Sequence, residues 1–523
     1  MSEDRSLREI RLEKLERLRA LGMDPFQQEK FESSHSATQL LDQFDQLQDQ
    51  EIRLAGRLVS YRLMGKAGFA HLSDGEGKIQ AYFKRDLLTE SLWEAYSELL
   101  DIGDHLGVRG KLFVTKTGER TIEVHSFVPL SKSLQPLPLG KEKDGERWYG
   151  LADAETRFRH RHLDLIANPE ARRRLVDRMK ITASVRRYFD QAGYLEAETP
   201  MLQVVAGGAA ARPFKTHYNV YDLDVKLRIS LELYLKRLIC GDIPRVYEIG
   251  RVFRNEGVST RHNPEFTLLE FYEAYANLED MMRRVEELFR FVASEVYGTC
   301  VVQVPEHEGM RPAERAQLVE GHLPIDFSKP WARVNMLEAI EKATGLTRED
   351  LSDLSRATQR IRELGLTDPE SGKHIELEKE RNLGGLIEKL LEVYVEPQLV
   401  QPSFVVGYPI ETSPLAKKDP NHPGMTRRFE GYIGCREVCN AFSEINDPID
   451  QHERFLHQVE QLGQGDDEAH PYDEEFLYAL EGGMPPTGGC GIGIDRMAMV
   501  LTGADSLREV LLFPMMKPIS DPV

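Results

Sequence analysis

The chain has 523 residues, a formal net charge of −19 at pH 7, 41% hydrophobic residues and 29% charged residues. This length predicts two or more domains, and the composition is typical of a soluble globular protein. No run of eighteen apolar residues occurs, so a membrane-spanning helix is not expected. Five cysteines are too few for a disulfide framework, which favours a cytoplasmic location. The negative charge argues against nonspecific nucleic-acid binding, although it permits a local basic patch.

The N-terminal 135 residues suggest a helical extension, residues 1–50, followed by a small β-barrel, residues 51–135. Residues 5–21 combine charges of both signs with leucine at helical spacing, which predicts either a solvated amphipathic helix or a basic face for nucleic-acid phosphates. The next region contains about five short β-type runs separated by glycine turns. Four of its side chains could share one face: Phe69, His71, Gln80 and Tyr82. Such a face suits unstacked bases, but ordinary strand alternation explains the same pattern.

The rest of the chain predicts a linker and then one large α+β domain. Residues 136–160 combine proline, glycine and clustered charge, as linkers do. Residues 161–523 contain two groups of strands, interrupted by a mainly helical insertion at about 277–400 in which 300–331 is expected to be loop-like. Near the end, a glycine-rich turn is expected to lead into a helix. Strand clusters of this kind indicate an antiparallel sheet and not alternating βα units.

The segment "FRNEGVSTRHNPEFTLLE", residues 253–270, carries opposed charges beside aromatic side chains. Read as two strands joined by a loop, it would be an antiparallel pair. Alternation then gives one surface with a cation, an aromatic ring, a carboxylate and a phenol: Arg254, Phe266, Glu270 and Tyr272. The loop would add Glu256, Arg261 and His262. The competing interpretation is a solvated, charged side of the sheet.

Two further segments have residue types suited to phosphate chemistry. In "RFEGYIGCRE", Glu430 and Glu437 flank a predicted hairpin turn and would repel each other unless a cation such as Mg²⁺ lay between them. Two solvated glutamates are the alternative. "GIGIDR", residues 491–496, could offer backbone N–H groups to phosphate, or simply allow close strand–helix packing. No Ser-His-Asp or Cys-His order stands out, and Cys435 with Cys439 lacks a second pair for zinc.

Together these motifs resemble the bacterial type of class II lysyl-tRNA synthetases over nearly the whole chain. "AGYLEAETPML" resembles the first family signature, residues 253–270 the second and "GIGIDR" the third. "GGAAARPFKTH", "LELYLKRL", "FSEINDP" and "GDDEA" resemble lysine-specific members. The resemblance implies an OB-type anticodon-binding barrel and a six-stranded antiparallel sheet flanked by helices. It also implies a homodimer with Pro200 at the interface, which joins L-lysine to tRNA(Lys) through lysyl-adenylate.

The resemblance also implies a role for individual residues. ATP would be bound by Arg254, Glu256, His262, Asn263, Phe266, Glu430, Glu437 and Arg496, with Arg254 and Arg496 as the catalytic cations and Glu430 and Glu437 as Mg²⁺ ligands. Lysine would be bound by Gly208, Glu232, Arg254, Glu270, Tyr272, Asn440, Phe442 and Glu444. Phe69 and Gln80 would read the anticodon.

The chain departs from the family pattern at three places. Cys435, Cys439 and Ala441 stand where bacterial relatives commonly have glycine, and a bulge is expected between Glu437 and Asn440. Ser230-Leu231 replaces the common Ala-Pro, and residues 304–323 are longer than usual.

Two alternative functions fit parts of the pattern. A paralogue that lysylates a translation factor would resemble the catalytic domain alone, so the predicted barrel argues against it. A nonenzymatic regulator on the same scaffold would usually lack signature residues, whereas Arg254, Glu437 and Arg496 are present.

Overall fold

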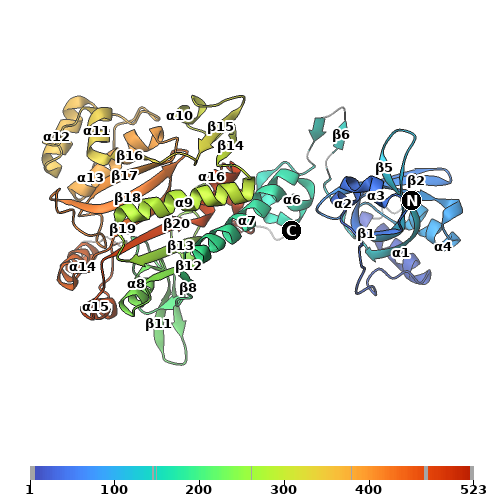
Figure 1. The fold of residues 1–523 in the computed structure, drawn as a ribbon, viewed down its shortest axis with the longest axis horizontal. Helices are drawn as coiled ribbons and strands as arrows, with labels where there is room; N and C mark the ends of the chain where they lie inside the picture. The colour runs from blue at the N-terminus through green and yellow to red at the C-terminus, as the bar shows by residue number, and fades with distance from the viewer. Residues whose placement is uncertain are drawn as a thin grey trace. The chain divides into compact units, whose positions relative to one another are not determined.

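The computed structural model describes residues 6–139, 141–143, 146–148, 150–260, 262–377, 380–463 and 469–518. The motif "GDDEA" therefore lies outside the described residues except for Ala469, and so does Arg261. The chain divides into two compact units, Met1–Asn168 and Pro169–Val523, which are described separately (Figure 1). The domain boundaries predicted at residues 50, 135 and 160 stay predictions.

Five strands of the first unit close into a barrel in the order β1-β2-β3-β5-β4, which confirms the predicted five-stranded barrel. The strands are β1 Ile52–Met64, β2 Ala67–Ser73, β3 Lys78–Lys84, β4 His105–Val114 and β5 Arg120–Ser131. Burial alternates along β2: Ala70 and Leu72 fill the interior, whereas Phe69 and His71 lie on the outer face. The period of two thus separates the barrel core from a polar and aromatic surface.

Short helices pack on the barrel strands: α1 Leu7–Ala20, α2 Ala37–Asp42, α3 Phe44–Leu47 and α4 Glu90–Glu94. The unit also holds the helices α5 Ala154–Arg159 and α6 Arg161–Ala167 and the strands β6 Lys141–Lys143 and β7 Glu146–Trp148. Helix α1 buries Leu15 and Leu18. Its Lys14 pairs with Asp101 at 2.6 Å and its Arg17 with Glu98 at 2.6 Å. These ion pairs agree with the amphipathic interpretation of this helix.

The second unit is built on a sheet in the order β16-β17-β18-β19-β20-β13-β12-β8. The central six strands are antiparallel neighbours, as predicted. The strands are β8 Leu195–Glu196, β12 Arg245–Phe253, β13 Glu265–Ala274, β16 Ala332–Asn335, β17 Ser403–Pro409, β18 Met425–Ile433, β19 Arg436–Ser443 and β20 Thr487–Gly493. The two edge strands β8 and β16 were not expected, and they pair in parallel because long crossovers lead from each to its neighbour.

One face of this sheet packs against helices, and the side chains between them form the hydrophobic core of the unit. Helices α7 Pro169–Gln191, α9 Leu278–Tyr297 and α16 Ile494–Thr502 pack on it, and Figure 1 shows α9 lying along the strands. Phe189 and Phe289 of these helices meet Leu269, Phe271 and Ile492 of the sheet. Because neighbouring residues in a strand point to opposite faces, the residues between these core positions are left for the other face.

Two local expectations about this unit are wrong. The stretch expected to be loop-like contains β14 Val301–Pro305, α10 Pro312–Arg315 and β15 His322–Asp326, and alternate strand residues such as Val302 and Ile325 join the core. Burial of these alternate residues stabilises strands despite the flanking prolines. The glycine-rich stretch before α16 is not a turn but the strand β20, paired on both sides.

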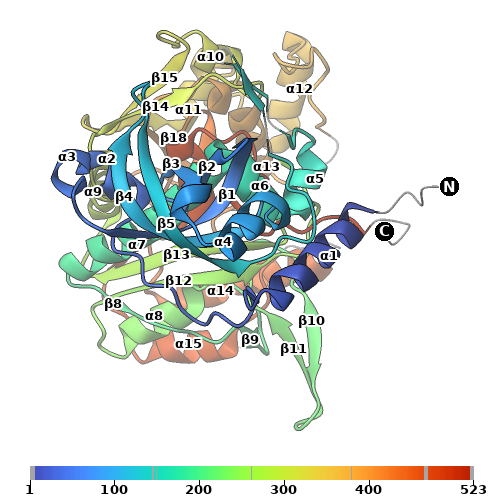
Figure 2. The same ribbon diagram turned by 90° about the vertical axis from the view of Figure 1, so that its right-hand side faces the viewer.

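The remaining elements complete the second unit. They are β9 Leu202–Gln203, β10 Lys215–Tyr218, β11 Leu223–Leu227, α8 Glu232–Cys240, α11 Met336–Thr344, α12 Leu354–Leu364, α13 Leu383–Leu390, α14 Pro448–Gly463, α15 Glu474–Glu481 and α17 Leu507–Val510. The β10–β11 hairpin projects away from its unit in both views (Figures 1 and 2). In the described part of the chain, no helix is long and apolar enough to cross a membrane.

Candidate functional site

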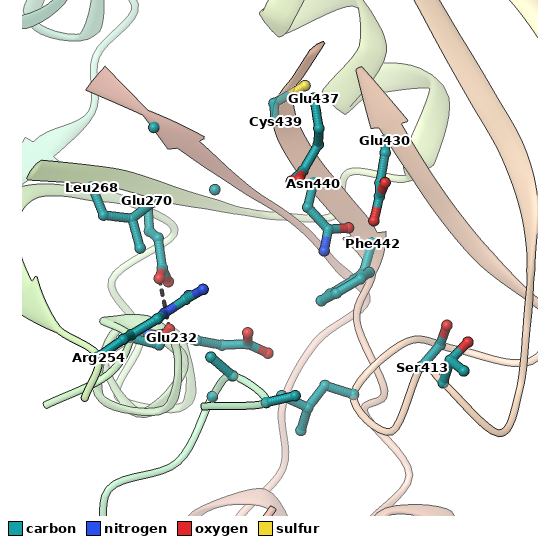
Figure 3. A pocket seen from close by; sticks show the side chains of 18 of the residues that line it. Glu232, Arg254, Leu268, Glu270, Ser413, Glu430, Glu437, Cys439, Asn440 and Phe442 are labelled. Atoms are coloured by element: carbon teal, nitrogen blue, oxygen red, sulfur yellow. Dashed lines mark hydrogen bonds between the residues drawn. The ribbon is translucent and has the colours of Figure 1, made fainter. Parts of the chain in front are cut away.

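A cavity of about 890 Å³ opens on the sheet face opposite the core helices. Its walls contain every residue predicted to contact ATP or lysine, from Gly208 to Arg496. Figure 3 shows some of them, among them Glu232, Arg254, Glu270, Glu430 and Glu437. The structure therefore brings these side chains together, while the role of each stays a prediction. Phe69 and Gln80 lie on the barrel, and Pro200 lies on the surface of the second unit.

The strands β12 and β13 form the predicted antiparallel pair. Val252 faces Phe266 and Val246 faces Tyr272 in the register, so Phe266, Glu270 and Tyr272 do share a face. Arg254 follows β12 directly, and its guanidinium lies 5.1 Å from the centre of the Phe266 ring. Burial lowers the pKa of Arg254, but an arginine still remains charged at neutral pH. This end of the cavity thus has a fixed cation beside an aromatic plane.

Glu270 is held by donors from three residues. Its Oε1 accepts hydrogen bonds from the Ser230 hydroxyl at 2.7 Å and the Leu231 backbone N–H at 3.0 Å. Its Oε2 accepts one from the Tyr272 hydroxyl at 2.9 Å. Burial, together with the negative charge of Glu232, raises the pKa of Glu270 to about 7. Ser230-Leu231, a departure from the family pattern, therefore has a structural role in orienting this carboxylate.

Two more buried carboxylates lie near Glu270, and a lysine that sequence reasoning missed lies between them. Glu232 begins α8, and Lys236 follows one turn later on the same helix. The Lys236 ammonium forms ion pairs with both Glu232 and Glu444. Burial raises the pKa of Glu444 to about 8 even though Lys236 acts in the opposite direction. The i,i+4 spacing of Glu232 and Lys236 is a sequence signal for their contact, but such pairs are usually on the surface.

The floor of the cavity below these carboxylates is the glycine strand β20. Gly489 lies between Tyr272 and Phe442 in the register. A Cβ added to Gly489 would overlap both the Glu444 carboxylate and the Tyr272 ring. Glycine is therefore required at this position because the two side chains pass directly over the backbone.

The β18–β19 hairpin carries the predicted metal-binding pair. Its two-residue turn, Gly434-Cys435, has positive φ at both positions, and Cys435 adopts φ 57° although it is not glycine. The register shifts where Gly431 pairs with Cys439 and Tyr432 pairs with Glu437. This irregularity is the predicted bulge, and it occurs with Cys439 in place of glycine.

The two glutamates of this hairpin have different partners. Glu430 accepts hydrogen bonds from the hydroxyls of Tyr432 at 2.7 Å and Tyr408 at 2.9 Å, and it pairs with Arg428 at 2.5 Å. Burial raises the pKa of Glu430. For Glu437, burial alone would raise the pKa, but the ion pair with Arg496 at 2.7 Å lowers it.

These two carboxylates alone do not form a complete metal site. Among the described residues, no group of three or more Asp, Glu, His or Cys side chains could hold a metal ion. A cation bound by Glu430 and Glu437 would need further oxygen ligands from the substrate.

The loop between β12 and β13 offers further polar groups to the cavity. The ring Nδ1 of His262 lies 3.0 Å from the Ser259 hydroxyl, and burial, then Arg496, lowers the pKa of His262. Asn263 donates through Nδ2 to the Glu265 carbonyl at 2.6 Å. Its buried Oδ1 accepts no hydrogen bond from the described residues. This acceptor is suited to an amine or hydroxyl of a ligand.

The outer face of the barrel carries the predicted aromatic and amide pair. Phe69 faces Tyr82 in the register, with ring centres 4.9 Å apart, and His71 faces Gln80. The Gln80 amide donates to Glu119 at 2.6 Å and accepts from the Thr121 hydroxyl at 2.8 Å. The predicted shared face is confirmed, and the amide of Gln80 is already oriented.

Comparison with known proteins places the chain in a family. Residues 153–517 match the model described as "tRNA synthetases class II (D, K and N)", and residues 52–130 match an OB-fold nucleic acid binding domain. The chain is 48% identical to a lysine–tRNA ligase of Carboxydothermus hydrogenoformans over 97% of both chains, and 47% identical to that of Moorella thermoacetica over 98% of both. The Bacillus subtilis lysine–tRNA ligase is 44% identical over 97% of both chains. The chain belongs to the class II tRNA synthetases (D, K and N).

Proposed function

We propose that the protein is a lysine–tRNA ligase that converts L-lysine and ATP to lysyl-adenylate and pyrophosphate and then transfers lysine to the terminal adenosine of tRNA(Lys). The observation that carries this proposal is a single cavity with two chemically different ends. One end has Arg254, Arg496 and the Phe266 ring, and the other has three buried carboxylates. A nucleotide with its phosphates suits the first end, and an amino acid with two ammonium groups suits the second.

The activation step needs no covalent group from the protein. A carboxylate oxygen of lysine attacks the α-phosphorus of ATP, and the bond to the β-phosphate oxygen breaks to release pyrophosphate. Arg254 is suited to contact both the attacking carboxylate and the α-phosphate, because its planar guanidinium has several donors and a constant charge. Catalysis then consists of positioning the two reactants and neutralising the phosphate charge.

The nucleotide contacts follow from the same geometry. The Phe266 ring would stack on adenine, with Arg496 on the opposite face of the base and near the γ-phosphate. Glu256, His262 and Asn263 would contact the nucleotide. The unpartnered acceptor Oδ1 of Asn263 supports this assignment.

Glu430 and Glu437 would hold Mg²⁺ together with the ATP phosphates. The fit is chemical: both are carboxylates on neighbouring strands that line the cavity, and Mg²⁺ is commonly held by one or two carboxylates plus substrate phosphates. When bound, the ion would reduce the negative charge of the phosphates. Arg496 pairs with Glu437 in the protein alone and would be shared with phosphate in the complex.

Lysine would lie in the acidic end of the cavity. Glu232 and Gly208 would contact its α-ammonium group, and Glu270, Tyr272 and Glu444 its ε-ammonium group. Asn440 and Phe442 line the wall beside them. A side chain without positive charge would leave buried carboxylates unpaired, and discrimination based on such unpaired groups is large.

The barrel and the oligomer complete the proposal. Phe69 and Gln80 would stack on and read the anticodon, supported by their shared outer face.

A homodimer with Pro200 at its interface is supported by exposed apolar residues beside it, Met201, Leu202 and Val204. We also propose a cytoplasmic location, where tRNA is charged for translation. The OB-fold match argues against a paralogue that modifies a protein.

The first test is ATP–pyrophosphate exchange with each amino acid. Lysine should support exchange in the absence of tRNA, because adenylate formation needs only the cavity. Exchange with aspartate or asparagine but not with lysine would contradict the proposal.

The second prediction concerns Phe69→Ala. Removing a stacking ring should reduce the rate of tRNA charging at limiting tRNA by about 5- to 100-fold, the range given by the loss of one base–aromatic stack. Lysine-dependent exchange should be unchanged. Phe26→Ala, an exposed phenylalanine in the same unit, is the matched control. Equal loss of charging and exchange would count against the anticodon assignment.

The third prediction concerns pH. Lysine binding requires the ionised forms of Glu270 and Glu444, whose pKa values are raised to about 7 and about 8. Protons on these groups compete with lysine, so raising the pH from 6 to 8.5 should lower the KM for lysine by at least about tenfold. The KM for ATP serves as the internal comparison. A KM for lysine that does not change over this range would refute the prediction.

The fourth prediction concerns Gly489→Ala. The added methyl group overlaps Glu444 and Tyr272 and should raise the KM for lysine by at least about tenfold, as a distorted binding pocket does. Gly491→Ala is the control for protein stability, since its Cβ would meet the Glu270 Cγ at 3.6 Å and the Asn440 carbonyl oxygen at 3.9 Å, both ordinary contact distances. A Gly489→Ala variant with unaltered KM for lysine would show that this part of the cavity does not bind lysine.

A further inference from the structure

Lys236 is completely buried beneath the acidic end of the cavity. It lies on α8, and its ammonium group contacts Glu232 on the same helix and Glu444 just beyond the end of β19. On its other side it lies 5.7 Å from the centre of the Phe476 ring of α15. Although burial opposes the charged form, the two carboxylates raise the pKa of Lys236. The residue therefore stays an ammonium ion at neutral pH.

The other ionisable groups around Lys236 can be counted. Glu232, Glu270 and Glu444 are all buried carboxylates. His470, in the segment before α15, is held neutral because burial, with Lys236 and Arg254, lowers its pKa to about 4. Burial raises the pKa of Cys240, further along α8, so this thiol is neutral as well. With its carboxylates ionised, this end has three negative charges and one positive charge, besides Arg254 at the phosphate end.

The two negative charges that remain match the two ammonium groups of lysine. The carboxylate of lysine needs the separate cation Arg254, so the filled site would be electrically balanced. Balance matters here because an uncompensated charge is costly when it is excluded from water. Without Lys236, a third carboxylate would have no counter-charge and would retain a proton.

We propose that Lys236 is a positioning and specificity-determining residue that sets the charge of the acidic end to match an amino acid with two ammonium groups. This inference rests on the proposed function. Lys236 acts through Glu232 and Glu444, because its own ammonium group forms an ion pair with each of these two carboxylates. The Oε1 atom of Glu444 accepts no hydrogen bond from the described residues, and so it remains available to the substrate.

Lys236→Met tests this inference because methionine is similar in length but has no charge. The KM for lysine in the exchange reaction should rise by at least about tenfold, while the KM for ATP should change by less than about threefold. The pH at which the KM for lysine reaches its minimum should rise by about one unit or more, since carboxylates without a counter-charge keep their protons to higher pH. A residue that only stabilised the fold would alter both KM values together and leave the pH profile in place.

Two variants serve as controls. Lys236→Arg retains the charge, so its pH profile should coincide with that of the wild type even if its KM for lysine differs. Arg237→Met removes the next cation on α8, which pairs with Asp473 at 3.1 Å and does not contact the three carboxylates. It should leave the KM for lysine and the pH profile unchanged. A pH profile for Lys236→Met that matches the wild type would overturn the proposal.

A measurement on the wild type keeps the proposal testable if Lys236→Met does not fold. Calorimetry of lysine binding at pH 7, in buffers of different ionisation enthalpy, reports the protons released. Glu270 and Glu444, whose pKa values are raised to about 7 and about 8, should be partly protonated at this pH, and Lys236 should keep its own proton. Release of about one to two protons supports the charge balance, whereas no release, or release of three, would overturn it. The proposed function has its own test: it is contradicted if the wild type shows no lysine-dependent exchange, whatever the result for Lys236.

Discussion

The acidic end of the cavity is built on a buried ionic cluster formed by Glu232, Glu270, Glu444 and Lys236. Carboxylates are costly to bury, and they persist only when hydrogen bonds or an opposite charge compensate them. Here Ser230, Leu231 and Tyr272 donate to one carboxylate, and Lys236 pairs with the other two. This compensation is incomplete, and in the proposed function the remaining negative charge makes the cavity selective for a cationic amino acid.

The sheet supplies the geometry that this cluster requires. Its strands bury one set of side chains against α7, α9 and α16, and the alternate set lines the cavity. In the middle of the sheet, β20 contributes glycine instead of side chains, which leaves space for Glu444 and Tyr272 above Gly489. The hydrophobic core and the binding cavity are therefore opposite faces of the same strands.

Strand alternation made much of this predictable from sequence. It placed Phe266, Glu270 and Tyr272 on one face, and it required a bulge between Glu437 and Asn440, both as observed. The assignment of individual roles came from family resemblance, because alternation cannot distinguish a cavity wall from a solvated surface.

Other features could not be predicted from local sequence patterns, because they depend on residues distant in the chain. Lys236 was missed because a Glu–Lys pair on a helix is ordinarily exposed, and its burial depends on Glu444, more than 200 residues away in the chain. The edge strand β8 has only two residues and pairs through a crossover, so it leaves no periodic signal. Gly489 belongs to a glycine-rich run that suggested a turn, and only its pairing partners on both sides reveal a strand.

The central claim is that Glu270 and Glu444 are partly protonated near neutral pH when the cavity is empty and ionised when lysine is bound. Carboxyl ¹³C NMR of the protein with labelled glutamate, assigned with Glu270→Gln and Glu444→Gln, measures this directly. Without lysine, two carboxyl groups should titrate near pH 7 and 8. With saturating lysine and a nonhydrolysable ATP analogue, both should stay ionised down to at least about pH 6, because the ammonium groups favour the charged forms. Titration of both groups near the ordinary glutamate value in the empty protein would contradict the account.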